Sequence, residues 1–123
     1  MHELSVCQAL LIQVEDLARK KAAASVERIT VECGPLSGVE PILLKDAFAI
    51  MRLGGIAAAA ELSIVSPRVS IECRECGRRN ETRPNRLVCA ACGGFRTRVI
   101  AGDELRLRSI EMQTLDPQPA GVA

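Results

Sequence analysis

Residues 73–92 read CRECGRRNETRPNRLVCAAC, and this stretch decides how the sequence is organised. Cys73 and Cys76 enclose two residues, and twelve residues later Cys89 and Cys92 repeat the same spacing. Two residues between thiols let both sulfurs reach one ion at about 2.3 Å. Two such pairs on facing hairpins complete a tetrahedron, so the spacing predicts a closed metal site with four cysteine ligands.

Zinc is the metal expected in this site, because four soft thiolates match its preference and no position remains for a reacting water. The site is therefore expected to be structural rather than catalytic. Gly77 and Gly93 each follow a cysteine pair and allow tight turns whose amides can bond the thiolates. Iron in a rubredoxin-like site is the alternative on ligand grounds, and a disulfide in each pair is a weaker one.

On the N-terminal side of this stretch, two helices and two strands are expected. Residues 4–22 place apolar side chains on one helical face, and residues 28–33 alternate as a half-buried strand does. A loop at residues 34–38 leads to Pro41, which opens a second helix that ends before Gly54-Gly55. Its apolar stripe comprises Leu43, Leu44, Ala47, Phe48 and Met51, and a second strand around Leu62 and Ile64 precedes Pro67.

On the C-terminal side, a third strand is expected over residues 105–112. Leu105 and Leu107 alternate with polar residues, but Ile110 and Met112 continue the pattern with the opposite parity. A regular strand would place the two pairs on opposite faces, which predicts a β-bulge near Arg108-Ser109. The tail from Asp116 has two prolines and no apolar pattern, so it is expected to be mobile.

The expected fold is α+β, with two helices packed on a three-stranded sheet and an inserted zinc-ribbon-like four-cysteine module. The predicted division is a discontinuous domain of residues 1–68 and 99–123, with a zinc-binding module at residues 69–98. The module is rich in Arg and poor in aromatic residues, so zinc is expected to replace an apolar core there.

The first three residues form a second candidate metal site. His2 is the only histidine of the chain and directly follows Met1. A retained Met1 offers its α-amine, which with the backbone nitrogen and imidazole of His2 can chelate one cation. The backbone nitrogen of Glu3 can complete a square plane, a geometry that favours Cu(II) or Ni(II) over zinc. Amine and imidazole bind only when deprotonated, so affinity should fall with pH.

Four motifs together resemble the HypA/HybF family of nickel-insertion accessory proteins for [NiFe]-hydrogenase maturation. They are residues 1–5 (MHELS), residues 34–41 (GPLSGVEP), the paired cysteine motifs, and residues 102–105 (GDEL) with 109–111 (SIE). The likeness extends over residues 1 to about 112 in the same order. The second cysteine pair lacks the proline that often follows its first cysteine in the family, a change that affects turn rigidity more than metal ligation.

The resemblance implies nickel bound at Met1, His2 and Glu3, with Glu40 as a weaker candidate ligand. It also implies structural zinc at Cys73, Cys76, Cys89 and Cys92. The implied function is that of a non-enzymatic nickel metallochaperone. Its implied partners are a nickel-binding GTPase and the hydrogenase large subunit, and a homodimer is an open option. Cys7 and Cys33 lie on apolar faces and are interpreted as buried hydrophobic residues rather than ligands.

Composition narrows the remaining alternatives. The net charge of +1, the absence of a long apolar run and the lack of a signal-like N-terminus favour a cytoplasmic protein without membrane or nucleic-acid partners. The main alternative is a nucleic-acid-binding zinc ribbon or an adaptor, but seven Arg, three Glu and a zinc–thiolate centre leave only roughly +2 on residues 69–98. A thiol redox protein would normally carry a single CxxC motif at a helix N-terminus.

Overall fold

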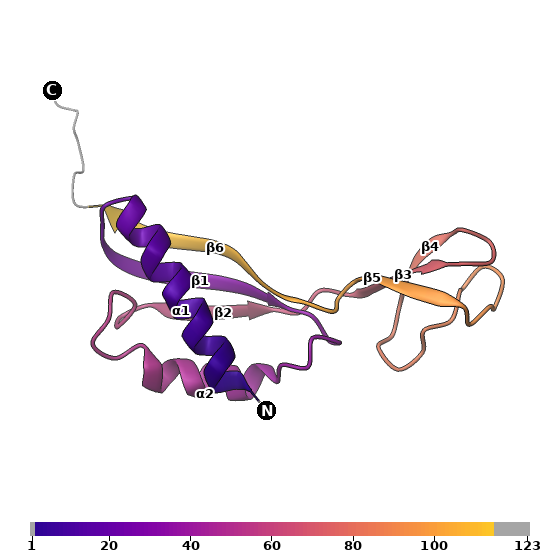
Figure 1. Cartoon of the computed structure of the whole chain (residues 1–123), viewed down its shortest axis with the longest axis horizontal. Coiled ribbons are helices and arrows are strands. Elements are labelled where there is room, and N and C mark those ends of the chain that lie inside the picture. The colour runs from indigo at the N-terminus through magenta and orange to yellow at the C-terminus, as the bar shows by residue number, and fades with distance from the viewer. Residues whose placement is uncertain (1, 115–123) are drawn as a thin grey trace, which may run out of the picture. The chain divides into compact units, whose positions relative to one another are not determined.

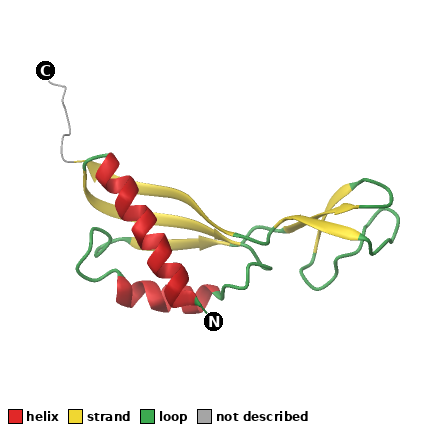
Figure 2. Cartoon of the chain, in the orientation of Figure 1, coloured by secondary structure: helices red, strands yellow, loops and turns green. Residues whose placement is uncertain are grey.

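The computed structural model describes residues 2–114 (Figure 1), and the predicted mobile tail from Asp116 lies outside them. Within the described chain there are two helices and six strands, as Figure 2 shows by colour. In chain order they are α1 (Glu3–Lys20), β1 (Ala23–Cys33), α2 (Pro41–Met51), β2 (Glu61–Val65), β3 (Val69–Cys73), β4 (Arg79–Thr82), β5 (Thr97–Ala101) and β6 (Leu105–Thr114).

The described residues divide into two compact units. The first, here called the helical unit, comprises residues 2–31, 40–63 and 107–114 and contains both helices. The second, called the cysteine unit, comprises residues 32–39 and 64–106 and contains all four cysteines of the paired motifs. The predicted α+β class, with two helices, a three-stranded sheet and a four-cysteine module, is confirmed.

Helix α1 buries one face, as its apolar periodicity predicts. The buried side chains are Cys7, Leu10, Leu11, Val14 and Ala18. The prediction for Leu4 is wrong, because this side chain is 62% exposed. The buried position in the first turn is taken instead by Glu3, which is 6% exposed and whose carboxylate has a partner on the segment before α2.

Helix α2 has the predicted bounds and buries Leu44, Ala47 and Phe48. Leu43 was expected in the same stripe, but it is 48% exposed, so this prediction is wrong. Pro41 opens the helix, where its missing N–H costs no hydrogen bond. α1 and α2 pack against each other.

The strands of the first sheet lie in the order β2-β1-β6. Ile29, Val31 and Cys33 of β1 are buried as the alternation predicts, although the strand begins five residues earlier than expected, at Ala23. Figure 2 shows α1 lying across one face of this sheet, and the core of the helical unit lies between them. On β6 the consecutive residues Arg108 and Ser109 are both exposed, whereas the β-bulge itself stays a prediction.

A second sheet, in the order β4-β3-β5, was not predicted from the sequence. β3 is its central strand and pairs antiparallel with both neighbours, with Ile71 opposite Asn80 on β4 and Val99 on β5. Val69 and Ile71 are 1% and 0% exposed, so the cysteine unit has a small apolar core next to its sulfurs.

The loop that follows β1 is held against residues 102–104. The backbone N–H of Gly34 donates to the carbonyl of Glu104 over 2.9 Å, and the N–H of Leu36 donates to the carbonyl of Gly102 over the same distance. A Cβ on Gly34 would lie 2.3 Å from the Gly102 oxygen, so only glycine fits here. Gly102 itself has a φ of +97° and lies against the backbone of Val69.

Candidate metal centre

The structure brings the four sulfurs of the paired motifs together at one end of the cysteine unit. All four Sγ atoms lie within 4.8 Å of one another. The Sγ atoms of Cys73 and Cys92 are 3.6 Å apart, as are those of Cys76 and Cys89. Each short distance therefore joins a sulfur of one motif to a sulfur of the other, which is the arrangement of a shared ion.

The two cysteine motifs have the same backbone hydrogen bonds. In the first motif the N–H of Gly77 donates to the carbonyl of Cys73 over 3.0 Å, and the N–H of Cys73 donates to Arg78 over 2.9 Å. In the second motif the corresponding bonds join Gly93 to Cys89 and Cys89 to Gly94, over 2.9 and 2.8 Å. Gly77 and Gly93 have φ values of +78° and +75°, so both predicted glycine turns are confirmed.

Backbone N–H groups of the turns point at the sulfurs. The N–H groups of Glu75 and Cys76 approach the Cys73 sulfur at 3.4 and 3.5 Å. The N–H of Cys76, followed by that of Glu75, lowers the pKa of the Cys73 thiol. The N–H groups of Cys92 and Ala91 lower the pKa of Cys89 to about 6. Hydrogen bonds of this kind favour the thiolate form that binds a metal.

The pKa of the Cys92 thiol is raised, in contrast to those of Cys73 and Cys89, because four sulfurs are crowded together. The N–H of Gly94 lowers the pKa of this thiol, but the Cys73 sulfur, desolvation and the other cysteines outweigh it and raise the pKa to about 12. Four thiolates this close repel one another unless a cation lies between them. A tetrahedron with metal–sulfur bonds of about 2.3 Å separates its sulfurs by about 3.8 Å, close to the two Sγ–Sγ distances of 3.6 Å. The donor set and its spacing therefore fit Zn(II).

Asn80 supports the site and was missed in the sequence. Its side-chain amide donates to the Cys89 sulfur over 3.8 Å, and its Oδ1 accepts from the N–H of Ala90 over 3.3 Å. This side chain comes from β4, so it joins that strand to the second cysteine motif. No sequence spacing distinguishes Asn80 from Asn85, because only the pairing of β4 with β3 places it there.

The N-terminal candidate ligands are only partly described, since Met1 lies outside the described residues. His2 is exposed and is the N-cap residue of α1, where its side chain makes no capping hydrogen bond. Its carbonyl accepts from the N–H of Val6 over 2.9 Å and so begins the helix. The imidazole is therefore presented at the surface, at the start of a rigid element.

The Glu3 side chain has a structural role. Its Oε2 accepts a hydrogen bond from the backbone N–H of Glu40 over 3.0 Å. The positive amino terminus of the chain, followed by this N–H, lowers the pKa of Glu3 to about 2. Glu40 is exposed and occupies the N-cap position of α2 without a side-chain capping bond. The structure thus brings the backbone of Glu40 to Glu3, at the start of α1.

The two remaining cysteines, Cys7 and Cys33, are not members of the four-sulfur cluster. Cys7 is 0% and Cys33 1% exposed, which confirms their interpretation as buried residues. Burial raises the pKa of the Cys7 thiol. The Cys33 sulfur lies 3.4 Å from the Val39 carbonyl oxygen and 3.7 Å from Ser37 Oγ, so it holds the loop after β1.

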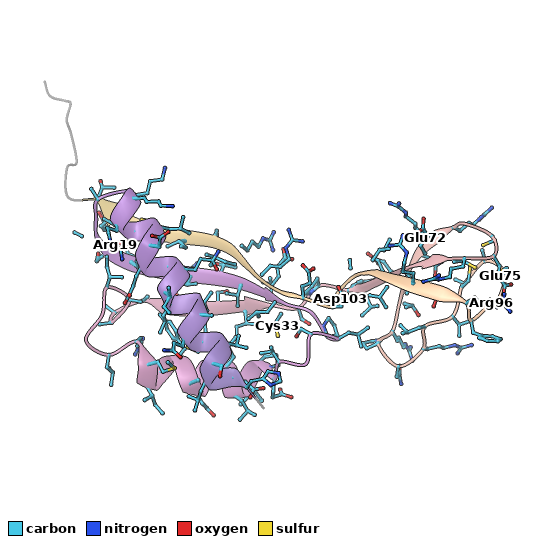
Figure 3. All side chains as sticks on the ribbon, in the orientation of Figure 1. Arg19, Cys33, Glu72, Glu75, Arg96 and Asp103 are labelled. Carbon is cyan, nitrogen blue, oxygen red and sulfur yellow. The ribbon has the colours of Figure 1, made fainter. Side chains whose placement is uncertain are left out.

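The glutamates of residues 69–98 are all paired with arginines. Glu72 contacts both Arg79 and Arg98, and the Arg98 guanidinium is the main cause that lowers the pKa of this carboxyl group. Arg96 lies 3.9 Å from Glu75, and Figure 3 shows these two residues on the loops beside the sulfurs. Such pairing reduces the positive charge available for a phosphate backbone.

The fold and the clustered sulfurs define a small α+β metal-binding protein with a four-cysteine ribbon module. A family model described as "Hydrogenase/urease nickel incorporation, metallochaperone, hypA" matches residues 1–112. The chain belongs to the HypA family of nickel-incorporation metallochaperones, as the sequence motifs predicted.

Individual relatives agree with this assignment. The chain is 40% identical over 113 residues to the hydrogenase maturation factor HypA of Aquifex aeolicus, covering 92% of this chain and 98% of that one. It is 39% identical to the HypA of Nitrosospira multiformis, covering 93% and 99%. The solution structure of the Ni metallochaperone HypA from Helicobacter pylori superposes with a TM-score of 0.69 at 33% identity, covering 91% and 97%. Among the described helices, none is long and apolar enough to span a bilayer.

Proposed function

We propose that this chain binds Ni(II) at its N-terminus and helps to insert it into the large subunit of a [NiFe]-hydrogenase during maturation. The observation that carries the proposal is the match of residues 1–112 to a nickel-incorporation family, together with an exposed His2 at the start of α1. Nickel is the cargo here, and the proposed role is transfer of a bound ion rather than catalytic turnover.

The proposed nickel ligands are the α-amine of Met1, the imidazole and backbone nitrogen of His2, and the backbone nitrogen of Glu3. Two features of the helical unit support them. An α-helix does not use its first N–H groups in its own hydrogen bonds, so nitrogen ligation at the start of α1 leaves the helix intact. The Glu3 carboxylate accepts from the Glu40 N–H, which leaves the backbone nitrogen as its proposed contribution.

Zn(II) is the proposed resident metal of the four-cysteine site, held by Cys73, Cys76, Cys89 and Cys92. It would supply cross-linking of the two motifs, because four protein ligands leave no position for substrate. The short Sγ–Sγ distances and the N–H groups around Cys73 and Cys89 support this role. The two proposed sites use different donors, nitrogen for nickel and sulfur for zinc, so they select different ions.

Release of nickel is proposed to occur by stepwise exchange of its nitrogen ligands for those of an acceptor protein. The exposed imidazole of His2 permits this because an incoming ligand can approach it without displacing packed side chains. The proposed partners are a nickel-binding GTPase and the hydrogenase large subunit, and the proposed location is the cytoplasm. The metallochaperone names of the matched family and structure support the general role.

The test uses tag-free, full-length protein titrated with nickel while its zinc content is measured. One nickel per chain is expected, and both His2→Ala and a short N-terminal extension should abolish this uptake without lowering zinc below one per chain. Glu15→Ala, an exposed change on the same helix, is the matched control. Unchanged nickel affinity in the His2 variant and in the extended chain would refute the proposed ligands.

A further inference from the structure

The four cysteine residues of the metal centre differ in their exposure to solvent. Cys73 and Cys89 are each 1% exposed, whereas Cys76 and Cys92 are exposed. Each motif thus contributes its first cysteine to the interior and its second to the surface. Cys73 and Cys89 are here called the inner pair, and Cys76 and Cys92 the outer pair.

Hydrogen bonding follows the same division. The Cys73 sulfur accepts from two backbone N–H groups, those of Glu75 and Cys76. The Cys89 sulfur accepts from the Asn80 amide and from the N–H groups of Cys92 and Ala91. In the outer pair, by contrast, one backbone N–H approaches each sulfur, from Arg78 at Cys76 and from Gly94 at Cys92.

These hydrogen bonds matter for reactivity. A donor group withdraws electron density from the sulfur it bonds, so each added N–H makes a thiolate a weaker nucleophile. Burial adds a second barrier, because an attacking molecule must reach the sulfur along the line of the new bond. Both effects protect the inner pair, and both are weaker at the outer pair.

A glycine lies directly beside one outer sulfur. A Cβ built on Gly94 would lie 3.2 Å from the Cys92 sulfur and 3.2 Å from Oε1 of Glu75. Gly94 does not have a positive φ, so its backbone conformation is open to other residues. The positive φ in this turn belongs to the preceding residue, Gly93. A methyl group at position 94 would therefore lie between the Cys92 sulfur and the Glu75 carboxylate, in contact with both.

We infer that Cys76 and Cys92 are modification sites of the zinc centre, at which soft carbon electrophiles react before they reach Cys73 or Cys89. The inference rests on the proposed zinc occupancy. In the reaction the sulfur lone pair forms a new S–C bond, and the leaving group departs with the electron pair of its bond to carbon. The resulting thioether carries no charge, so zinc loses an anionic ligand and is released.

The test treats the zinc-loaded full chain with substoichiometric iodoacetamide, from which iodide leaves, and maps the label by mass spectrometry at early times. Trypsin separates Cys73 from Cys76 at Arg74, and fragment ions distinguish Cys89 from Cys92 on their shared peptide. The outer pair is expected to be labelled about tenfold faster than the inner pair. A colorimetric chelator detects the zinc that is released, and zinc release should proceed at the same rate as labelling of the outer pair. The buried thiols of Cys7 and Cys33 serve as internal references.

Gly94→Ala provides a matched variant, because the added methyl group shields only one of the two outer sulfurs. It should lower the labelling rate of Cys92 several-fold and leave that of Cys76 unchanged. Zinc-loaded protein labelled equally at all four cysteines, or first at Cys73 or Cys89, would overturn the inference while leaving the proposed zinc site intact. Protein that is purified without zinc and cannot be loaded would overturn both.

Discussion

The carboxylate of Glu3, in the first turn of α1, accepts a hydrogen bond from the backbone N–H of Glu40, the N-cap residue of α2, over 3.0 Å. This bond connects the N-terminal segment that carries the proposed nickel ligands to the start of α2. It also explains why Glu3 is the buried charged residue of the described chain, since a buried carboxylate needs a donor.

The first prediction concerns this bond. Glu3→Gln removes the charge of the acceptor and should lower the thermal midpoint of the helices by a few degrees at neutral pH. The positive amino terminus of the chain, and after it the Glu40 N–H, lower the folded-state pKa of Glu3 from 4.5 to about 2. The stabilisation is therefore present above pH 4.5 and is lost as the pH falls toward 2.

The difference between wild type and Glu3→Gln should accordingly shrink to nothing near pH 2. Thermal melts followed by circular dichroism at 222 nm check this, because α1 and α2 are the helices of the described residues. Glu15→Gln on the exposed side of α1 is the control and should leave the midpoint unchanged. A gap between wild type and Glu3→Gln that persists unchanged to pH 2 would contradict the assigned role of the carboxylate.

The second prediction concerns Gly34. Gly34→Ala should destabilise the protein by about 1–3 kcal/mol, because the new Cβ would meet the backbone oxygen of Gly102, which cannot move aside as a side chain can. Gly55→Ala is the control, since its nearest atom is the flexible Glu15 carboxylate at 3.2 Å. Urea denaturation of both variants gives the comparison. Equal free energies of unfolding for the two variants would show that the loop after β1 can shift at no cost.

The third prediction concerns Asn80. Asn80→Ala removes the amide that donates to the Cys89 sulfur and should lower zinc affinity by roughly 10-fold or more, as loss of a hydrogen bond to a metal ligand commonly does. Competition with a chromophoric chelator measures the affinity. Asn85→Ala, in the exposed loop after β4, is the matched control. Identical zinc affinities for the two variants would contradict a supporting role for Asn80.

The fourth prediction tests the proposed boundary between the zinc-binding module and the remaining domain. Cys73→Ser should unfold residues 69–98, because the apolar core of this region is limited to a few side chains such as Val69 and Ile71. The described residues of the helical unit, 2–31, 40–63 and 107–114, should keep their protection against hydrogen exchange. Protection that survives throughout residues 69–98 in this variant would show that the second sheet is stable without its metal.

The fifth prediction concerns nickel and protons. The α-amine of Met1 and the imidazole of His2 must be deprotonated to bind Ni(II), so nickel affinity should fall steadily as the pH is lowered below neutrality. Calorimetric titration of tag-free protein in several buffers checks both the affinity and the number of protons released. Affinity that does not change with pH would exclude a nitrogen-donor site of this kind.

Local patterns in the sequence were sufficient for much of the fold. The apolar spacing of Cys7, Leu10 and Val14 predicted α1, and the alternation of Ile29, Val31 and Cys33 predicted the buried face of β1, because both depend on the periodicity of a single element. The CxxC spacing indicated a shared ion because it too is a local pattern: the two residues between the cysteines limit the distance between their sulfurs. The resemblance to the HypA/HybF family came from short motifs in order along the chain.

Such local patterns could not predict contacts between residues far apart in the sequence. Leu4 and Leu43 fit an apolar stripe but are exposed, because burial depends on which part of a helix another element covers. Asn80 contacts the Cys89 sulfur because strand pairing places it there. Gly34 lies against Gly102, which is 68 positions away in the sequence, and only the folded structure shows this contact.

The sequence by itself therefore determined the two helices, the three strands of the first sheet, the four cysteines that cluster, and the family. Only the tertiary structure decided that Glu3 is tied to Glu40, that a second sheet contains β3 and β4 beside the cysteine motifs, and which two of the four cysteines are exposed. The physical reason is that periodicity and spacing act within one element. Burial and hydrogen bonding between distant residues arise only when the elements are assembled.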